Sequence, residues 1–439
     1  MTRIACSLVA LSGALLGSGA VAHAQEFGVS EAVEGPGYPM GEGTVLHPIF
    51  GAEAGFTDNV FSAYRNSQRH ASGILRLVAE AYIASKDVDP SAAALAEEAA
   101  LEGEEAAEPA AQAIQFRGGG RLEYTEYLST DGVVRSQRGI GADLTGNLLV
   151  APEGTFSFGV KDHLIRSTKP TNFYSFEGTN RIANTLTLAL TYQPGGRTMK
   201  GGLRWENQID VFEDSDQQFG NRMINAIHGG FDWQLFPYTK LYADASYGFI
   251  SPMGDGGAIP SIKRGASPIR GGAGVATAIT ELFTVKAHVG WAYASYAGGT
   301  GYNTPIFGTE VGYRYSPTGR VVGEYLWDHR DSLNSDYYRD HMFGIHVDQN
   351  VGRIVATGGL DFRLRHYSGI PMAVGAPTRD DILFAATVRA SYVFKDWLAG
   401  VAEWRTEIDD TAYRSVFMGD VSDPSYVRTE VTAGIRAAL

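Results

Sequence analysis

Apolar and polar residues alternate with a period of two along many segments of this chain, and the alternation continues for about ten residues or more. In the segment 283–293, the odd positions are Phe, Val, Ala, Val, Trp and Tyr, whereas the even positions include Thr, Lys, His and Gly. The segments 241–249, 353–364 and 427–439 show the same pattern. Such alternation indicates β-strands with one apolar and one polar face. Because strands of soluble proteins usually have about five or six residues, the length of these segments favours strands that cross a bilayer at a tilt.

The connections between these segments alternate between short and long. Short turns, many with Gly or Pro to supply the dihedral angles of a tight turn, recur at 152–154, 194–196, 237–238, 280–281, 317–319, 350–352 and 395–396. Longer polar connections lie between them, at 169–178, 212–220, 252–265, 332–338, 368–379 and 411–424. Short turns at one end and long loops at the other are typical of outer-membrane barrels, in which the short turns face the periplasm.

The sequence therefore predicts an all-β fold, a transmembrane antiparallel up-and-down β-barrel of about 18 strands, with 16 or 20 as the neighbouring alternatives. An even number of strands places both ends of the barrel on the periplasmic side. The strands are expected to start near His47, Ala71, Ala113, Arg138, Thr155, Thr179, Arg197, Asn221, Thr239, Ala266, Leu282, Thr304, Arg320, Arg339, Arg353, Asp381, Trp397 and Tyr426.

Residues 1–24 are predicted to be a secretory signal peptide. Arg3 gives a positive start, residues 4–16 are mostly apolar, and Ala22-His23-Ala24 forms a small-x-small cleavage site. The single cysteine, Cys6, lies in this segment, so the mature chain is expected to have no disulfide and no cysteine-ligated metal. No later stretch approaches the roughly 18 consecutive apolar residues of a membrane helix. An exported chain of amphipathic strands is expected in the cell outer membrane.

Two segments are expected to lie outside the wall of a barrel formed by residues 47–439. Residues 25–46 are a Gly- and Glu-rich periplasmic lead, and residues 86–110 are an acidic Ala/Glu insertion after the second strand, on the periplasmic side. Ala and Glu favour a helix, whereas the overall composition favours an unstructured linker. A docking element for a periplasmic partner is a further interpretation of the insertion.

Charge and aromatic content agree with a membrane barrel. The formal net charge of −13 argues against a nucleic-acid partner, which requires a basic face. Aromatic residues flank the expected turns and loops, as in the two girdles at the lipid–water interfaces. Those beside the short turns are Tyr192, Phe236, Tyr238, Phe283, Tyr315, Phe394 and Trp397; those toward the long loops are Phe249, Trp291, Tyr293, Tyr325, Trp327 and Trp404. Outer-membrane lipid is the expected surrounding.

The polar faces of the strands carry ionisable residues of both signs. The candidate pore-lining residues are Arg117, Arg121, Glu123, Arg204, Glu206, Lys286, Arg320, Glu324, Arg353, Asp361, Arg363, Arg365, Glu403, Arg405, Arg428 and Glu430. Since buried charges need partners, many of these residues would pair across neighbouring strands and stabilise the wall. Alternatively, they line a water-filled channel and filter solutes by charge. No segment is long enough to form a large plug domain, and barrels of about 16 to 18 strands usually enclose water unless plugged.

Catalysis is not expected. Three Asp-His pairs occur, at 162–163, 328–329 and 340–341, but adjacent residues of a strand point to opposite faces. No G-x-S-x-G or H-E-x-x-H motif is present. We predict no catalytic residues, no cofactor and no metal site.

The opening hairpin carries a more specific pattern. Residues 47–61 read HPIFGAEAGFTDNVF, and Ile74-Leu75-Arg76-Leu77 follows. A first strand that ends in an Asp-Asn-Val-Phe step, before a second that begins with Ile-Leu-Arg, resembles the opening of the β-barrel porin 2 family. The specific likeness covers about 30 residues, and the rest of the mature chain is similar only in general character. The insertion 86–110 departs from the family pattern, as does Leu439, which stands where outer-membrane proteins usually end in an aromatic residue.

The resemblance implies an outer-membrane barrel, and some members of that family are encoded with exopolysaccharide secretion systems. A conduit for secreted polysaccharide, working with a periplasmic polysaccharide export component, is therefore the favoured hypothesis. A general diffusion porin for small hydrophilic solutes is the first alternative, and a homo-oligomer, in particular a trimer, would favour it. A structural barrel with a blocked lumen is the second.

Overall fold

The computed structural model describes residues 35, 37–40, 44–63, 69–85, 113–152, 154–167, 180–195, 198–254, 264–333, 335–370, 378–417 and 420–439. The expected signal peptide, most of the lead and the insertion 86–110 lie outside the described residues.

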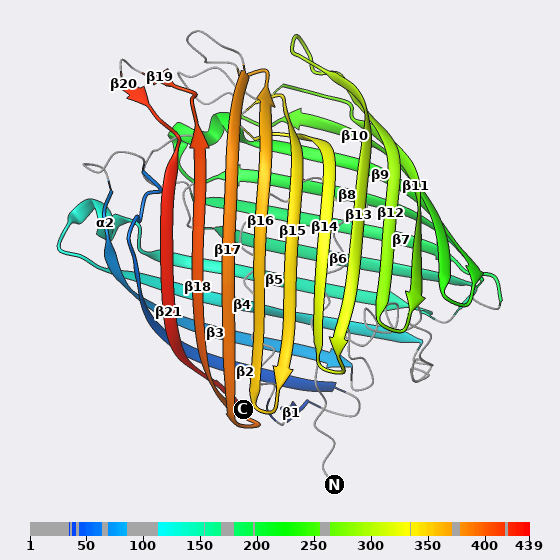
Figure 1. Cartoon of the computed structure of the whole chain (residues 1–439), viewed down its shortest axis with the longest axis horizontal. Coiled ribbons are helices and arrows are strands. Elements are labelled where there is room, and N and C mark those ends of the chain that lie inside the picture. Colours follow the sequence, from blue (N-terminus) through cyan, green and yellow to red (C-terminus); the bar gives the residue numbers. More distant parts are fainter. Residues whose placement is uncertain are drawn as a thin grey trace.

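A closed antiparallel β-barrel forms almost the whole of the described chain (Figure 1). Its 19-stranded sheet consists of the two-residue edge strand β1 (Tyr38–Pro39) and the strands of the barrel wall. These are β2 (Thr44–Thr57), β3 (Ser72–Ser85), β4 (Ile114–Leu128), β5 (Gly139–Val150), β6 (Phe156–Ser167), β7 (Arg181–Tyr192), β8 (Met199–Phe212), β9 (Arg222–Phe236), β10 (Thr239–Pro252), β11 (Ile269–Thr280), β12 (Phe283–Ala294), β13 (Tyr302–Ser316), β14 (Gly319–Asp331), β15 (Tyr337–Val351), β16 (Ile354–Ser368), β17 (Thr378–Lys395), β18 (Leu398–Thr411) and β21 (Tyr426–Ala438).

The wall closes where the last strand, β21, pairs with the first, β2, in the register Ile49↔Ala438 to Thr57↔Glu430. Every other wall strand pairs with its neighbours in sequence, so the topology is up-and-down. The backbones approach closely at this seam: a Cβ on Gly55 would lie 2.1 Å from the carbonyl oxygen of Val431. The absence of a side chain at Gly55 therefore allows the seam to close.

The prediction of an 18-stranded barrel is confirmed. Each expected strand start lies within a few residues of the observed one. One difference changes the boundary of the barrel. The first wall strand, β2, begins at Thr44 rather than near His47, and it pairs with β1. Pairing with β3 continues down to Thr44↔Ser85, so backbone hydrogen bonds extend the wall into the last residues of the expected lead.

Short segments of other structure occur mostly in the long connections. A helix, α2 (Gly132–Ser136), lies between β4 and β5, and Asp131 caps its N-terminus by accepting a hydrogen bond from the amide of Val133. A 3-10 helix, η2 (Ser215–Gly220), follows β8, and the hairpin of β19 (Ser415–Phe417) and β20 (Asp420–Ser422) precedes β21. Within the described residues, no helix is long and apolar enough to cross a membrane.

The outer face of the wall is apolar and the inner face is polar. Leu203, Val289 and Ile435 are 56%, 61% and 57% exposed on the outer face. Aromatic side chains of both expected girdles are exposed there as well, including Phe236 near a short turn and Trp291 toward a long loop. Exposed apolar area on this scale is stable only against another apolar phase, which for a closed barrel is the lipid bilayer.

Some polar pairs lie within the apolar outer face. The Asn184 amide donates to Asp162 Oδ1 at 3.1 Å between β6 and β7, and the Asn207 amide donates to Asn225 at 3.0 Å between β8 and β9. Each pair meets part of its own hydrogen-bonding need, which lowers the cost of placing polar groups beside lipid.

Candidate functional site on the inner wall

The candidate pore-lining residues lie where their alternation predicts, with one exception. All but Arg353 occupy strand positions that alternate with exposed apolar residues of the outer face, so their side chains lie on the inner wall. Arg353 lies in the turn between β15 and β16, where its Nη1 donates to the carbonyl oxygen of Phe394 at 3.3 Å. The inner-wall residues fall into groups with different surroundings.

A buried charge network spans β21, β2, β3 and β4, across the seam. Three arginines and three glutamates alternate in a closed ring: Arg76–Glu53 (3.2 Å), Glu53–Arg436, Arg436–Glu80 (3.3 Å), Glu80–Arg121 (3.6 Å), Arg121–Glu123 (2.8 Å) and Glu123–Arg76 (2.9 Å). Glu430 joins the ring through Arg76 at 2.7 Å and also contacts Arg428 at 3.0 Å. We call these eight residues the Arg76 network.

The Arg76 network is neutral, since its four arginines balance its four glutamates. All of its side chains are at most 9% exposed. Buried charges of this kind persist only when each has partners of opposite sign. The network includes the first wall strand, β2, and the last, β21, as well as β3 and β4. It therefore joins the two ends of the sheet.

A second group narrows the barrel at the long-loop end. Arg222 on β9 contacts Asp210 on β8 at 2.8 Å and also Asp331 on β14. Arg270 on β11 likewise contacts Asp328 on β14. Because β14 is not a neighbour of β9 or β11 in the sheet, these ion pairs cross the interior of the barrel.

An apolar cluster lies beside these ion pairs. Its buried members, which we call the mouth cluster, are Ile250, Ala266, Ala292, Ala294, Tyr296, Tyr302 and Ile306. Burial raises the pKa of Tyr296, so its phenol stays protonated and donates to Asp331 Oδ1 at 3.2 Å. The mouth cluster and the crossing ion pairs therefore fill the side of the mouth between β9 and β14.

Part of the inner wall is open. Gly202 on β8 pairs with Gly230 on the neighbouring strand β9. A Cβ built on either glycine would meet no atom within 4 Å. Charged side chains of the inner wall are also accessible: Asp244, which pairs with Gly230 in the sheet, is 31% exposed, and Arg389 on β17 is 38% exposed. The inner wall thus has free space at these two glycines, and it carries water-accessible charge both beside them and on β17.

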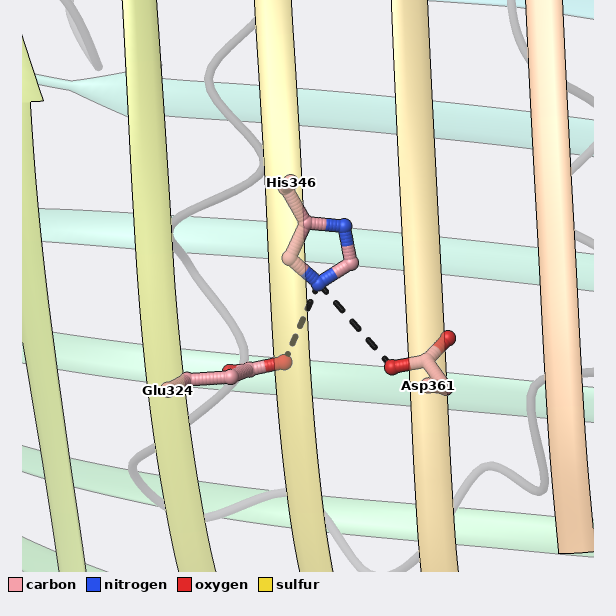
Figure 2. A group of neighbouring side chains, drawn as sticks. All are labelled: Glu324, His346 and Asp361. Carbon is pink, nitrogen blue, oxygen red and sulfur yellow. Dashed lines mark hydrogen bonds and ion pairs between the residues drawn. The ribbon is translucent and has the colours of Figure 1, made fainter.

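A three-residue cluster lies on the accessible inner wall of β14, β15 and β16. Figure 2 shows Glu324 and Asp361 approaching His346 from the strands on either side. The Nε2 atom of His346 lies 3.2 Å from Glu324 Oε1 and 4.0 Å from Asp361 Oδ1. These side chains are between 18% and 28% exposed, unlike those of the Arg76 network. The cluster combines one nitrogen and two carboxylate groups that face water.

Two of the three sequence-adjacent Asp-His pairs have separate surroundings. His163 contacts Asp143 on the inner wall at 2.8 Å, whereas Asp162 contacts Asn184 on the outer face. Asp340 is bound by Arg365, while the ring of His341 contacts the hydroxyl of Tyr325 at 3.0 Å. Neighbouring residues therefore point to opposite faces, as strand geometry requires.

Several residues of these groups were not among the sequence-based candidates. They include Glu53, Arg76, Glu80 and Arg436 of the Arg76 network and His346 of the three-residue cluster. The alternation predicts that their side chains point inward. Their contacts, however, depend on the register between strands. Pairing of β14 with β15 and β15 with β16 sets Glu324 and Asp361 opposite the same residue, Gly344.

No family model matches the chain, and no curated protein matches it. Solved structures similar to it include Pseudomonas aeruginosa OccK5 (OpdH), with a TM-score of 0.45 and 10% identity over 91% of this chain and 99% of that one. OccK2 (OpdF) of the same organism, in complex with glucuronate, has a TM-score of 0.44 and 9% identity over 90% and 98%. The FrpB iron transporter of Neisseria meningitidis has a TM-score of 0.44 and 9% identity over 91% of this chain and 82% of that one.

Proposed function

We propose that this protein is an outer-membrane channel that conducts a secreted polysaccharide to the cell surface. The observation that carries the channel is the open inner wall at Gly202 and Gly230, enclosed by a wall with an apolar outer face. Free space lined by polar groups inside a membrane-spanning barrel offers a path for water and hydrophilic solutes.

The pairing of charges on the inner wall supports a polysaccharide as the solute. Among the accessible pairs, Arg389 contacts Glu403 at 2.7 Å and Arg405 contacts Glu407. Paired charges present local dipoles rather than a strong field of one sign, so they offer weak, repeated contacts to hydroxyl groups without trapping the chain. The resemblance of residues 47–61 and 74–77 to a family with members encoded beside exopolysaccharide secretion systems points the same way.

Deleting the gene is expected to abolish a surface polysaccharide, because synthesis and inner-membrane export would continue without an exit. Lectin labelling and quantification of cell-surface and periplasmic sugar measure the effect, and a plasmid-borne wild-type copy should restore it. Unchanged surface polysaccharide in the deletion strain would contradict the proposed cargo. It would not contradict an open channel, which conductance in planar bilayers tests separately.

A general diffusion porin is the second candidate function, and the crowded mouth favours it. Ion pairs that cross the interior from β9 and β11 to β14 narrow the long-loop end, which suits small solutes better than a polymer. Liposome swelling separates the two functions: a porin admits monosaccharides and disaccharides without preference for a polymer, whereas a dedicated exit binds oligosaccharide and is blocked by it.

Filling the open inner wall is expected to reduce the conductance of the channel. In planar bilayers, Gly230→Trp should lower the single-channel conductance at least twofold, because the indole projects into the space that the glycine leaves. Gly229→Trp is the matched control: this neighbour on β9 lies on the outer face and a Cβ there also meets no atom within 4 Å. Equal conductance in the two variants, or no conductance in wild type, would contradict an open lumen.

A further inference from the structure

We propose that Glu324, His346 and Asp361 form a binding site for a divalent transition-metal ion on the inner wall of the barrel. Their three ligand atoms all lie within 4.8 Å of one another. The inference goes beyond the proposed channel function, because it requires only that ions reach the inner wall.

The register of three strands builds the site. Gly344 on β15 pairs with Glu324 on β14 and with Asp361 on β16, so the two carboxylates flank one glycine in a row across the sheet. His346 is two residues further along β15, and therefore on the same face. Its Nε2 atom is the point at which both carboxylates converge (Figure 2).

Two glycines make room for this arrangement. A Cβ on Gly344 would lie 2.5 Å from Glu324 Oε1, so the glutamate side chain occupies the space above this residue. A Cβ on Gly359 would lie 3.2 Å from His346 Nδ1, so the imidazole ring packs over this second glycine, where there is no side chain. The wall thus forms a shallow cradle beneath the three ligand groups.

The distances suit an ion of the size and bonding of Zn²⁺. Zinc binds His nitrogen and carboxylate oxygen at about 2.0–2.2 Å, which separates neighbouring ligand atoms by roughly 3.4 Å in a tetrahedral site. The His346–Glu324 separation of 3.2 Å matches this value, and the His346–Asp361 separation of 4.0 Å needs a shift of under about 1 Å at the end of Asp361. One nitrogen with two carboxylates selects Zn²⁺ and related transition metals over Ca²⁺ and Mg²⁺, which prefer oxygen ligands alone.

Partial exposure gives the ion access and leaves a coordination position open. The ligand side chains are accessible at between 18% and 28%, so an ion enters from the lumen and completes its coordination with water. Because an imidazole nitrogen and carboxylates bind a metal ion only when they are deprotonated, the affinity falls as the pH falls. A bound divalent ion would neutralise two carboxylates of the inner wall.

Isothermal titration of the untagged, folded barrel in detergent tests the site with Zn²⁺ as the probe. We expect one ion per barrel, with Mg²⁺ and Ca²⁺ failing to compete at a hundredfold excess. His346→Gln and Asp361→Asn should each weaken binding at least tenfold. His288→Gln is the matched control, because within the described residues His288 pairs with one carboxylate, Asp244, at 3.1 Å on the same inner wall.

A glycine variant tests the geometry without removing a ligand. Gly344→Ala should weaken Zn²⁺ binding at least fivefold, because its Cβ takes the space of the Glu324 carboxylate. Gly323→Ala, whose Cβ would meet no atom within 4 Å, is expected to bind as wild type. Heat-modifiable gel mobility checks that every variant is folded. No Zn²⁺ binding by the folded wild type, or binding unchanged by His346→Gln, overturns the proposal whether or not the barrel conducts.

Discussion

Replacing Arg76 with leucine is expected to destabilise the folded barrel by about 3 kcal/mol, since removing one partner of a buried ion pair costs about 3–5 kcal/mol. The Arg76 guanidinium contacts Glu53, Glu123 and Glu430 within 3.2 Å, and its side chain is only 8% exposed. Its loss leaves the Arg76 network with a net negative charge in a place that water scarcely reaches. Each glutamate keeps one other arginine partner, which places the cost at the lower end of the range.

Guanidinium unfolding in lipid vesicles, followed by tryptophan fluorescence, measures this loss. The matched control is Arg389→Leu, because the Arg389–Glu403 pair is 38% and 23% exposed and such pairs contribute less than about 1 kcal/mol. A second change, Glu430→Gln, should restore part of the stability of Arg76→Leu by removing the excess charge. Equal losses for Arg76→Leu and Arg389→Leu would contradict a structural role of the Arg76 network.

The strands could be predicted closely from the sequence because one local rule governs them. Side-chain alternation sets the faces of each strand, and turn residues such as those at 317–319 set where it ends. The rule failed slightly at Thr44, where the outcome depends on pairing: β2 continues for as long as β3 supplies backbone partners. Strand ends are therefore less predictable than the existence and number of the strands.

The contacts of the inner wall could not be predicted because they depend on register between distant parts of the chain. Arg76 and Glu430 are separated by most of the mature sequence, and only closure of the seam brings them together. Glu324 and Asp361 meet His346 only because both pair opposite Gly344. Parity shows that a side chain points inward but not which residue it meets.

The contacts at the mouth of the barrel could not be predicted from side-chain alternation or turn residues, for a different reason. Arg222 and Arg270 lie at strand ends and reach across the interior to β14, so their contacts depend on the cross-section of the closed barrel. No turn or alternation pattern encodes that shape. The narrow mouth, which separates the two proposed functions, therefore emerges only in three dimensions.

Placing an arginine on the outer face at Leu203 is expected to destabilise the barrel by more than about 1 kcal/mol, because a basic residue on the lipid face costs about 2–4 kcal/mol at the bilayer midplane and about 0–1 kcal/mol near the interfaces. Leu203 is 56% exposed and lies between Gly201 and Trp205 on the outer face of β8. In a bilayer, the guanidinium must either lose water or pull headgroups inward. In a soluble barrel the same change would bring the charge into water at almost no cost.

The neighbouring residue provides the opposite expectation on the same strand. Gly202→Arg adds the same charge to the inner wall, where a Cβ meets no atom within 4 Å, so the side chain stays in water and stability should change by about 0.5 kcal/mol or less. Unfolding of both variants in vesicles of one lipid composition gives the comparison directly. A small cost for Leu203→Arg would contradict a lipid-facing outer wall, and a large cost for Gly202→Arg would mean that the bore near β8 lacks room for water. The pair therefore tests, with one charge moved by one residue, both the membrane location and the open interior on which the channel depends.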